Sequence, residues 1–257
     1  MQTLSIMNLK GGVGKTVSSI NIAHILTTVY GAKVLLVDND KQGNTSKFLN
    51  RHDYKHTGMA EIMTEEEPDT KRIIQHTDFE KLDVITANMK LYKANLDVQF
   101  DEKRPQQTRL KEALEQVQGD YDFCIIDNAP DINVSTINAL VASDDVIIPV
   151  TIDDFSIDGL EELKEQIENT QKGMNPDLCF MGCFITQFDR TNEADVQGED
   201  FLQKQDCNLF RTHIRKTVKM KQSTFARIPI IEYSSRCAAA IDYKKFVEEY
   251  LQRLNEM

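Results

Sequence analysis

A glycine-rich turn that ends in Lys15 and Thr16 carries the clearest chemistry in the chain. An apolar stretch, residues 3–7, precedes the turn, and a helical pattern with apolar residues on one face, residues 20–26, follows it. This order of strand, turn, Lys-Thr and helix predicts a phosphate-binding loop. Glycines let successive N–H groups approach phosphate oxygens, and the start of the helix adds partial positive charge. Lys15 should therefore contact the β- and γ-phosphates, and the Thr16 hydroxyl should bind Mg²⁺.

The loop departs from the common pattern G-x-x-x-x-G-K-[ST], because Leu9 occupies the place of the first glycine. It reads K-G-G-x-G-K-T, and its first residue is a second lysine, Lys10. This pattern resembles the deviant Walker A motif of the ParA/MinD family of ATPases. The resemblance implies that the loop binds ATP or ADP with Mg²⁺, and that Lys10 reaches across a dimer interface to the partner's nucleotide. The expected nucleotide-binding residues are Gly11, Gly12, Val13, Gly14, Lys15, Thr16 and Val17.

The simpler alternative is a glycine-rich turn with two solvated lysines. The strand before the turn and the helix after it disfavour this alternative, because they are the context that the phosphate-binding motif requires.

Two aspartates, Asp38 and Asp40, lie at the carboxyl end of a second apolar stretch, residues 32–38, that predicts a buried strand of a parallel sheet. The carboxyl ends of such strands are where open α/β sheets bind ligands. A carboxylate there can orient a water toward the γ-phosphate or contact the water shell of the metal. The stretch 38–44 resembles the D-x-D-P-Q-G-N motif of ParA proteins, with Lys41 in place of the proline. By this resemblance Asp40 is the catalytic candidate and Asp38 a further metal contact through water; a polar turn that bends at Gly43 is the alternative.

Residues 121–127 form the clearest buried strand in the sequence, and Asp127 closes it. An apolar strand that ends in aspartate downstream of a phosphate loop has the form of a Walker B strand, whose acid holds Mg²⁺ directly or through water. ParA proteins more often have Thr-Pro-Pro after this aspartate, whereas this chain has Asn-Ala-Pro at 128–130. Asp127 is therefore predicted to share the metal with Thr16.

The net charge of the chain is −11, yet residues 207–227 contain six cations and no aspartate or glutamate. Such a block is an electrostatic feature suited to a polyanion, since lysine and arginine gain affinity for a duplex by releasing counterions. The stretch resembles the region of ParA proteins that contacts DNA non-specifically, with Lys219 in place of an arginine. The candidate DNA-binding residues are Arg215, Lys216, Lys219, Lys221 and Arg227. The alternative is a solvated basic surface that balances the acids or contacts the nucleotide.

Apolar stretches that alternate with helical patterns predict an α/β fold, with a doubly wound, mainly parallel sheet flanked by helices, of the P-loop NTPase type. We expect one domain over residues 1–257, with surface helices and loops over residues 50–80. Further strands are expected at residues 82–86, 145–150 and 178–186, and further helices at 106–117, 135–142, 155–171 and 238–254. By resemblance, residues 187–189 lie beside the adenine; an ordinary strand-to-helix loop is an equal alternative.

No apolar run approaches the ~20 residues of a membrane span, and residues 1–7 have the pattern of a first strand rather than a signal peptide. We therefore expect a cytoplasmic protein. The five cysteines are odd in number, and several lie in apolar stretches. Buried thiols are favoured over disulfides or a metal site, because no second pair of ligands accompanies Cys179 and Cys183.

The resemblance to ParA proteins implies a partition ATPase that forms a homodimer on binding ATP, binds DNA non-specifically as the dimer, and releases it after hydrolysis. It also implies a ParB-like protein that stimulates hydrolysis, and association with the nucleoid. Lys10, Lys15 and Asp40 would be the catalytic residues. The alternative is a MinD-like positioning ATPase that acts on a membrane or protein scaffold. No membrane partner is expected, because Glu248 and Glu249 lie in the middle of the last helix.

Overall fold

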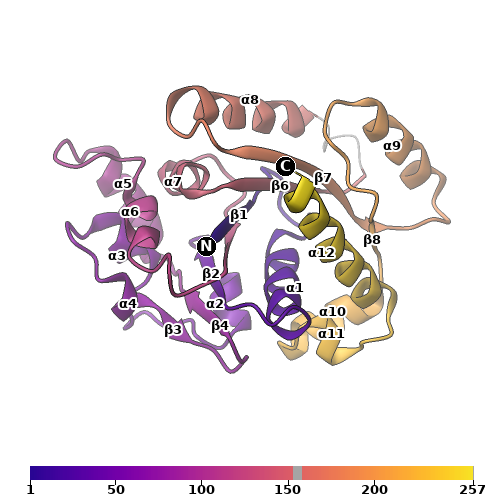
Figure 1. The fold of residues 1–257 in the computed structure, drawn as a ribbon, viewed down its shortest axis with the longest axis horizontal. Helices are drawn as coiled ribbons and strands as arrows, with labels where there is room; N and C mark the ends of the chain where they lie inside the picture. The colour runs from indigo at the N-terminus through magenta and orange to yellow at the C-terminus, as the bar shows by residue number, and fades with distance from the viewer. Residues whose placement is uncertain (153–157, 257) are drawn as a thin grey trace.

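One eight-stranded sheet runs through the protein, whose computed structural model describes residues 1–152 and 158–256 (Figure 1). The strand order is β3-β4-β2-β5-β1-β6-β7-β8, and the strand pairs are parallel except β3 with β4. The strands are β1 Gln2–Ile6, β2 Val34–Asn39, β3 Gln75–His76, β4 Leu82–Ile85, β5 Phe123–Asn128, β6 Asp145–Val150, β7 Cys179–Phe188 and β8 Ile214–Arg215.

Helices cover both faces of this sheet (Figure 1). They are α1 Lys15–Thr28, α2 Asn44–Phe48, α3 Met59–Thr64, α4 Thr70–Ile73, α5 Lys90–Gln99, α6 Arg109–Glu115, α7 Val134–Ala142, α8 Asp158–Gly173, α9 Glu193–Lys204, α10 Val218–Ala226, α11 Ile230–Tyr233 and α12 Ala238–Glu256. The predicted α/β fold with a mainly parallel sheet flanked by helices is therefore confirmed.

Alternate residues of the central strands enter different cores, because successive side chains of a strand point to opposite faces. In β2, Val34 and Leu36 pack in one core with residues of α1 and α12. Leu35 and Val37 pack in the other with residues of α3, α5 and α6. Burial on both faces explains why these strands read as continuous apolar runs.

Two features of the structure differ from the expectations. The segment 50–80 is not only surface, since Met59, Ile62 and Met63 are fully buried in the core that α5 and α6 share. Their spacing is helical, but α3 is six residues long and precedes an acidic run, so the periodic signal is short. Asp38 lies near the carboxyl end of β2, as predicted, although the strand continues to Asn39. The sheet also has an antiparallel edge strand, β3, that the sequence did not predict.

The region after residue 190 contains α9, α10, α11 and β8, none of which was predicted from the sequence. The predicted helix 155–171 corresponds to α8, and its first three residues lie outside the described part of the chain. The other predicted elements correspond to β4, β5, β6, β7, α6, α7 and α12 within a few residues at each end.

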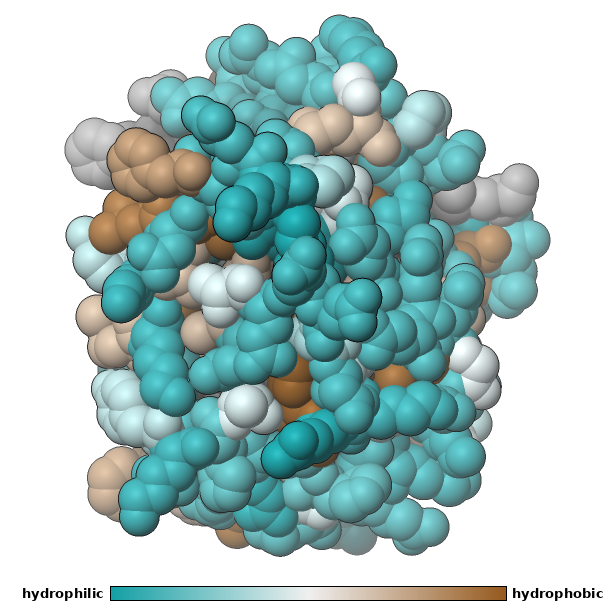
Figure 2. Space-filling view, turned by 90° about the vertical axis from the view of Figure 1, so that its left-hand side faces the viewer, coloured by the Kyte–Doolittle hydropathy of each residue, from teal (hydrophilic) through white to brown (hydrophobic). Residues whose placement is uncertain are grey.

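Three of the five cysteines are buried, Cys124, Cys183 and Cys207, whereas Cys179 and Cys237 are partly exposed. Within residues 1–152 and 158–256, no helix is long and apolar enough to cross a membrane. The side of the molecule that carries α3, α4, α5 and α6 is mostly hydrophilic, with small apolar areas scattered among the polar side chains (Figure 2).

His24 of α1 is almost fully buried. That burial lowers the pKa of its imidazole, although the carboxylate of Glu232, whose Oε1 lies 2.9 Å from His24 Nε2, acts in the opposite direction. Because the folded state disfavours the charged imidazole, the unfolded chain binds more protons below the ordinary pKa of 6.5. We expect the free energy of unfolding to fall as pH drops below 6.5, by up to about 1.4 kcal/mol per pH unit from this residue. Urea unfolding at pH 7.5 and 5.5 should show a smaller pH effect in His24→Gln. An equal pH effect in both proteins would contradict this role.

Candidate functional site

The phosphate loop leaves β1 at the carboxyl edge of the sheet and is shaped by two glycines and one asparagine. Gly12 and Gly14 have φ of 81° and 91°, a backbone region that other residues rarely adopt. Gly14 is the N-cap of α1, so the helix begins directly at Lys15. Asn8 Nδ2 donates to Pro149 O over 2.7 Å, and its Oδ1 accepts from the N–H of Lys10 over 2.9 Å. Asn8 therefore fixes the entry of the loop to the neighbouring strand β6.

Lys15 lies inside the loop, with 7% of its surface exposed, and its ammonium donates to Lys10 O over 2.8 Å. Burial lowers the pKa of this ammonium, and three nearby aspartates partly oppose the effect: Asp127, Asp40 and Asp131. The loop thus curls around its own cation, and the loop N–H groups and α1 surround the same space. This arrangement matches an anion site in which a phosphate would lie between the ammonium and the start of the helix.

The carboxylate of Asp127, at the end of β5, joins three segments. It accepts hydrogen bonds from the hydroxyl of Thr16, from Ser19 Oγ over 3.3 Å and from Thr45 Oγ1 over 2.7 Å. Burial raises its pKa to about 6, while the bonds from Thr45 and Thr16 and the charge of Lys15 act in the opposite direction. Thr16 and Asp127 thus lie together, as the Walker motifs require.

Asp38 and Asp40 have different surroundings. Asp38 is fully buried beside Asp127, its register partner in the sheet, and burial with that neighbouring charge raises its pKa to about 8. Its Oδ2 accepts from the N–H and the hydroxyl of Ser46 over 2.8 and 2.6 Å, and its Oδ1 accepts from Asp40 N–H over 3.2 Å. Asp40 Oδ1 accepts from the N–H of Gln42 over 2.9 Å. Asp38 thus holds the turn that carries Asp40.

The end of β7 supports the loop from the other side. Thr186 Oγ1 donates to Val13 O over 2.7 Å, and Gln187 Nε2 donates to Gly12 O over 2.8 Å. Two cavities of about 420 Å³ each flank the loop here. The first is lined by residues 10–12, the end of β7 and the turn before α9, and the second by Gly12, Gly14, Val17 and residues 214–218, 220 and 221.

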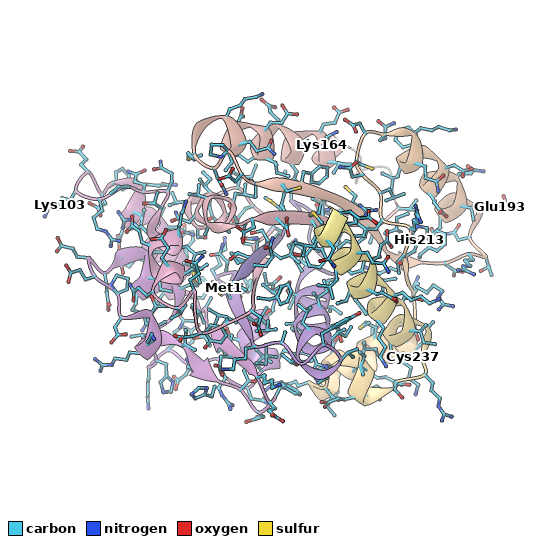
Figure 3. The ribbon with its side chains drawn as sticks, in the orientation of Figure 1. Met1, Lys103, Lys164, Glu193, His213 and Cys237 are labelled. Atoms are coloured by element: carbon cyan, nitrogen blue, oxygen red, sulfur yellow. The ribbon has the colours of Figure 1, made fainter. Side chains whose placement is uncertain are left out.

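The basic segment enters this region after His213, whose Nε2 lies 3.5 Å from Glu199 Oε1 of α9 (Figure 3). Arg215 is held by the buried carboxylate of Asp242 on α12, through its backbone N–H and through Nε and Nη2 over 3.0, 2.8 and 2.6 Å. Lys216 lines both cavities, and Arg215 and Lys221 line the second.

The remaining two candidates for DNA contact lie outside these cavities. Lys219 Nζ is 6.0 Å from the centre of the Tyr233 ring, and Arg227 Nη1 donates to Asn50 Oδ1. The basic segment is therefore divided between residues that face the loop and residues that face solvent.

The donors at the loop fit magnesium. Mg²⁺ takes oxygen ligands and is commonly held by one or two carboxylates together with substrate phosphates and water. Thr16 and Asp127 offer a hydroxyl and a carboxylate of this kind. Over the described residues, no group of three or more His, Cys, Asp or Glu side chains is placed to hold a metal ion, so a cage made by the protein alone is not formed there.

Comparison with known proteins gives the family. A family model described as an AAA domain matches residues 1–180. The chain is 34% identical over 247 residues to the sporulation initiation inhibitor protein Soj of Bacillus subtilis, with 96% of each chain covered. It is 31% identical over 257 residues to the chromosome partitioning protein ParA of Caulobacter vibrioides, covering 98% of this chain and 95% of the relative. The chain belongs to the ParA/Soj family of partition ATPases.

A solved structure extends the likeness to the fold. The cobyrinic acid a,c-diamide synthase of Mycobacterium smegmatis, with a bound ATP analogue and magnesium, matches with a TM-score of 0.85 and 27% identity. The match covers 99% of this chain and 96% of that one. The predicted membership of the family and the predicted ATPase class are confirmed.

Several residues that shape the site of this ParA/Soj protein were not predicted from the sequence. Thr45 and Thr186 each bond a site residue that lies far away in the chain, and Asn8 bonds both the nearby Lys10 and the distant Pro149 of β6. Asp242 lies 27 residues after Arg215. Of these residues, only Thr186 could have been found from the sequence, because it is a polar residue at the end of a predicted strand.

Thr45 should control how tightly the metal is held, because its hydroxyl positions Asp127. In Thr45→Val, we expect the Mg²⁺ affinity of the nucleotide complex to fall about 10- to 100-fold, as is usual when a group that orients a metal ligand is removed. Titration of Mg²⁺ against a fluorescent ATP analogue measures this.

Two controls make the result specific. Thr45→Ser keeps the hydroxyl and should retain most of the affinity. Thr170→Val removes another fully buried hydroxyl, one that donates to Gln166 O in α8, and should leave the Mg²⁺ titration unchanged. An unaltered titration in Thr45→Val would show that Asp127 does not need this bond.

Proposed function

We propose that this protein is a partition ATPase of the ParA type that binds MgATP, dimerises around two nucleotides, binds DNA non-specifically as the dimer, and releases it after hydrolysis. The observation that carries the proposal is the phosphate loop that begins with Lys10 and faces Asp40 and the Thr16–Asp127 pair across one edge of the sheet. A single domain over residues 1–257 would hold the whole cycle. The relatives named Soj and ParA support partition as the process.

The roles of the loop residues follow from their chemistry. Lys15 and the N–H groups of residues 11–17 would bind the phosphates, and Mg²⁺ held by Thr16 and Asp127 would neutralise charge between them. Asp40 would orient the attacking water toward the γ-phosphate. Asp38 would hold the turn that carries Asp40 in place. It would also contact the metal through a water molecule.

Lys10 would act on the nucleotide of the partner subunit. A cation that meets the γ-phosphate only in the dimer stabilises charge that develops during transfer, so hydrolysis would depend on dimerisation. Lys10 lines the first cavity beside the loop, at the edge where a second copy would face it.

The second cavity is the proposed place of the base and ribose, since it opens next to Gly12, Gly14 and Val17. Arg215 would form part of its wall, because Asp242 holds the guanidinium there with two side-chain hydrogen bonds. Lys219 and Arg227, which lie outside both cavities, would provide phosphate contacts with DNA, together with Lys216 and Lys221, which also line the second cavity. The basic segment would thus contact both the nucleotide and DNA, the two roles that its sequence allows.

A ParB-like protein would stimulate hydrolysis, and the ATP-bound dimer would reside on the nucleoid in the cytoplasm. The MinD-like alternative, action on a membrane, is less favoured because α12 packs its apolar face into the core through Tyr243, Phe246, Val247 and Tyr250. A helix whose apolar face is buried in the protein core has little apolar surface left to insert into a membrane.

The trans role of Lys10 has a direct test. In Lys10→Ala we expect ATP binding to persist and turnover to fall about 10²- to 10³-fold, the usual cost of losing one group that stabilises the transition state. Steady-state hydrolysis and nucleotide binding are measured on the same protein. Lys103→Ala, which alters an exposed lysine between α5 and α6 (Figure 3), is the control and should match the wild type. Unchanged turnover in Lys10→Ala would remove the trans role.

DNA binding is tested with Asp40→Ala, which should bind ATP, dimerise and hydrolyse slowly. We expect this variant to bind random duplex DNA with ATP but not with ADP. The logarithm of its binding constant should fall linearly with the logarithm of salt concentration, because counterions are released from each neutralised phosphate.

Asp97→Ala is the matched control, since it removes an exposed aspartate of α5 and changes the net charge equally. It should not acquire the ATP-dependent binding. A dimer of Asp40→Ala that binds no DNA in either nucleotide state would reject DNA as the partner.

A further inference from the structure

Helix α10 lies on the surface and is attached to the protein along one narrow side. Ser223 is its one buried residue, and Ser223 Oγ donates to Ile228 O over 2.8 Å. Met220 is half-buried and packs against the core that contains α1 and α12. Thr217 caps the helix by accepting from the N–H of Lys219. The helix is thus held in place while most of its surface faces solvent.

One side of α10 carries two exposed apolar residues with a lysine between them, and two of the three, Val218 and Lys221, also line the second cavity beside the phosphate loop. Val218 is 73% exposed and Phe225 is 93% exposed, and Lys221 lies on the same side of the helix. Among the described residues, no other large apolar side chain is as exposed as Phe225. Exposing a whole phenylalanine ring is unfavourable, and none of the contacts that hold α10 in place uses this ring.

The charge around this ring suits a polyanion. Residues 207–227 contain six cations and no carboxylate, in a chain whose net charge is −11. Lys219, Lys221 and Arg227 lie on or at the end of α10, and Lys216 precedes it by two residues. Cations with one protruding aromatic side chain form a surface that fits duplex DNA, where phosphates flank an apolar stack of bases.

A membrane surface fits this helix less well. Val218 and Phe225 lie about 10 Å apart along the helix, so they do not form one apolar stripe. Together they offer about ten side-chain carbons, whereas even a whole myristoyl chain gives only marginal membrane binding. A second copy of the chain is also less favoured, since two such helices would bring like charges together.

We propose that Phe225 inserts as an apolar wedge between base pairs of the duplex, while the neighbouring cations of the basic segment contact the phosphates. This inference rests on the proposed function, since it describes how the same ATP-bound dimer would hold DNA. A wedge partly unstacks one base step and bends the duplex. Binding therefore has a part that does not depend on salt, and it is stronger at pyrimidine–purine steps, which deform easily.

The test compares single changes in the ATP-bound Asp40→Ala protein. Phe225→Ala should bind a 30-base-pair duplex about tenfold more weakly at every salt concentration, the scale of an aromatic contact with a base, with the same salt slope. Lys219→Ala, at a lysine outside both cavities, should instead reduce the salt slope by about one. Duplexes that carry 2-aminopurine report the wedge, because fluorescence rises when the base is unstacked by the parent and should not rise with Phe225→Ala.

Phe100→Ala is the matched control, since Phe100 follows α5 and is 83% exposed. It should leave affinity, slope and fluorescence as in the parent. Equal affinity and equal fluorescence for Phe225→Ala and the parent would overturn the wedge while leaving DNA binding intact. A parent that binds no DNA would instead reject the proposed function itself.

Two other outcomes would reassign the helix. Loss of the ATP-dependent dimer in Phe225→Ala, measured by light scattering, would place α10 between copies of the chain. Sedimentation of the parent with vesicles of anionic phospholipid, abolished by Phe225→Ala, would place it on a membrane. Either result overturns the DNA wedge.

Discussion

The site depends on one buried carboxylate, that of Asp127, because it joins the end of β5 to two helices. Thr16 and Ser19 lie at the start of α1, directly after the phosphate loop, and Thr45 lies in α2, and all three donate to the same group. A buried carboxylate with too few donors is costly, and its raised pKa of about 6 shows that burial outweighs the bonds it receives. Any shift of Thr45 therefore changes the charge and the position of the group that is proposed to hold the metal.

The parallel sheet brings these segments together. β1 lies between β5 and β6, and β2 pairs with β5, so the loops after three parallel strands emerge at one edge. The register places Asp38 directly beside Asp127, and two carboxylates so close cannot both be charged at low cost. Asp38 is the one with the higher pKa, and Ser46 donates to it twice. Its hydrogen bonds therefore hold in place the turn that carries Asp40.

The sequence predicted the motifs whose residues adjoin in the chain, but not the contacts between distant segments that depend on how the strands and helices are placed. Lys10, Lys15 and Thr16 are recognisable because the glycines, the strand and the helix adjoin them in the chain. The bond from Thr45 to Asp127 spans 82 residues and depends on how α2 sits over β5, which no local pattern contains. α10 carries no amphipathic pattern because most of its residues face solvent, so the periodicity that reveals buried helices is lacking. The core strands were predictable for the opposite reason, since burial on both faces makes them continuously apolar.

The basic segment connects the two proposed activities over a short distance. Arg215 is fixed by Asp242, and the next residue of α12, Tyr243, bonds Ser18 of α1 over 2.9 Å. One turn of α12 thus contacts both the helix that follows the phosphate loop and the strand that leads into α10. A nucleotide that displaced the wall of the second cavity would act on α10 through residues 215–218 alone. Under the proposed function, no extended pathway is needed to couple ATP to DNA, because the cavity wall and the DNA-facing helix belong to the same stretch of chain.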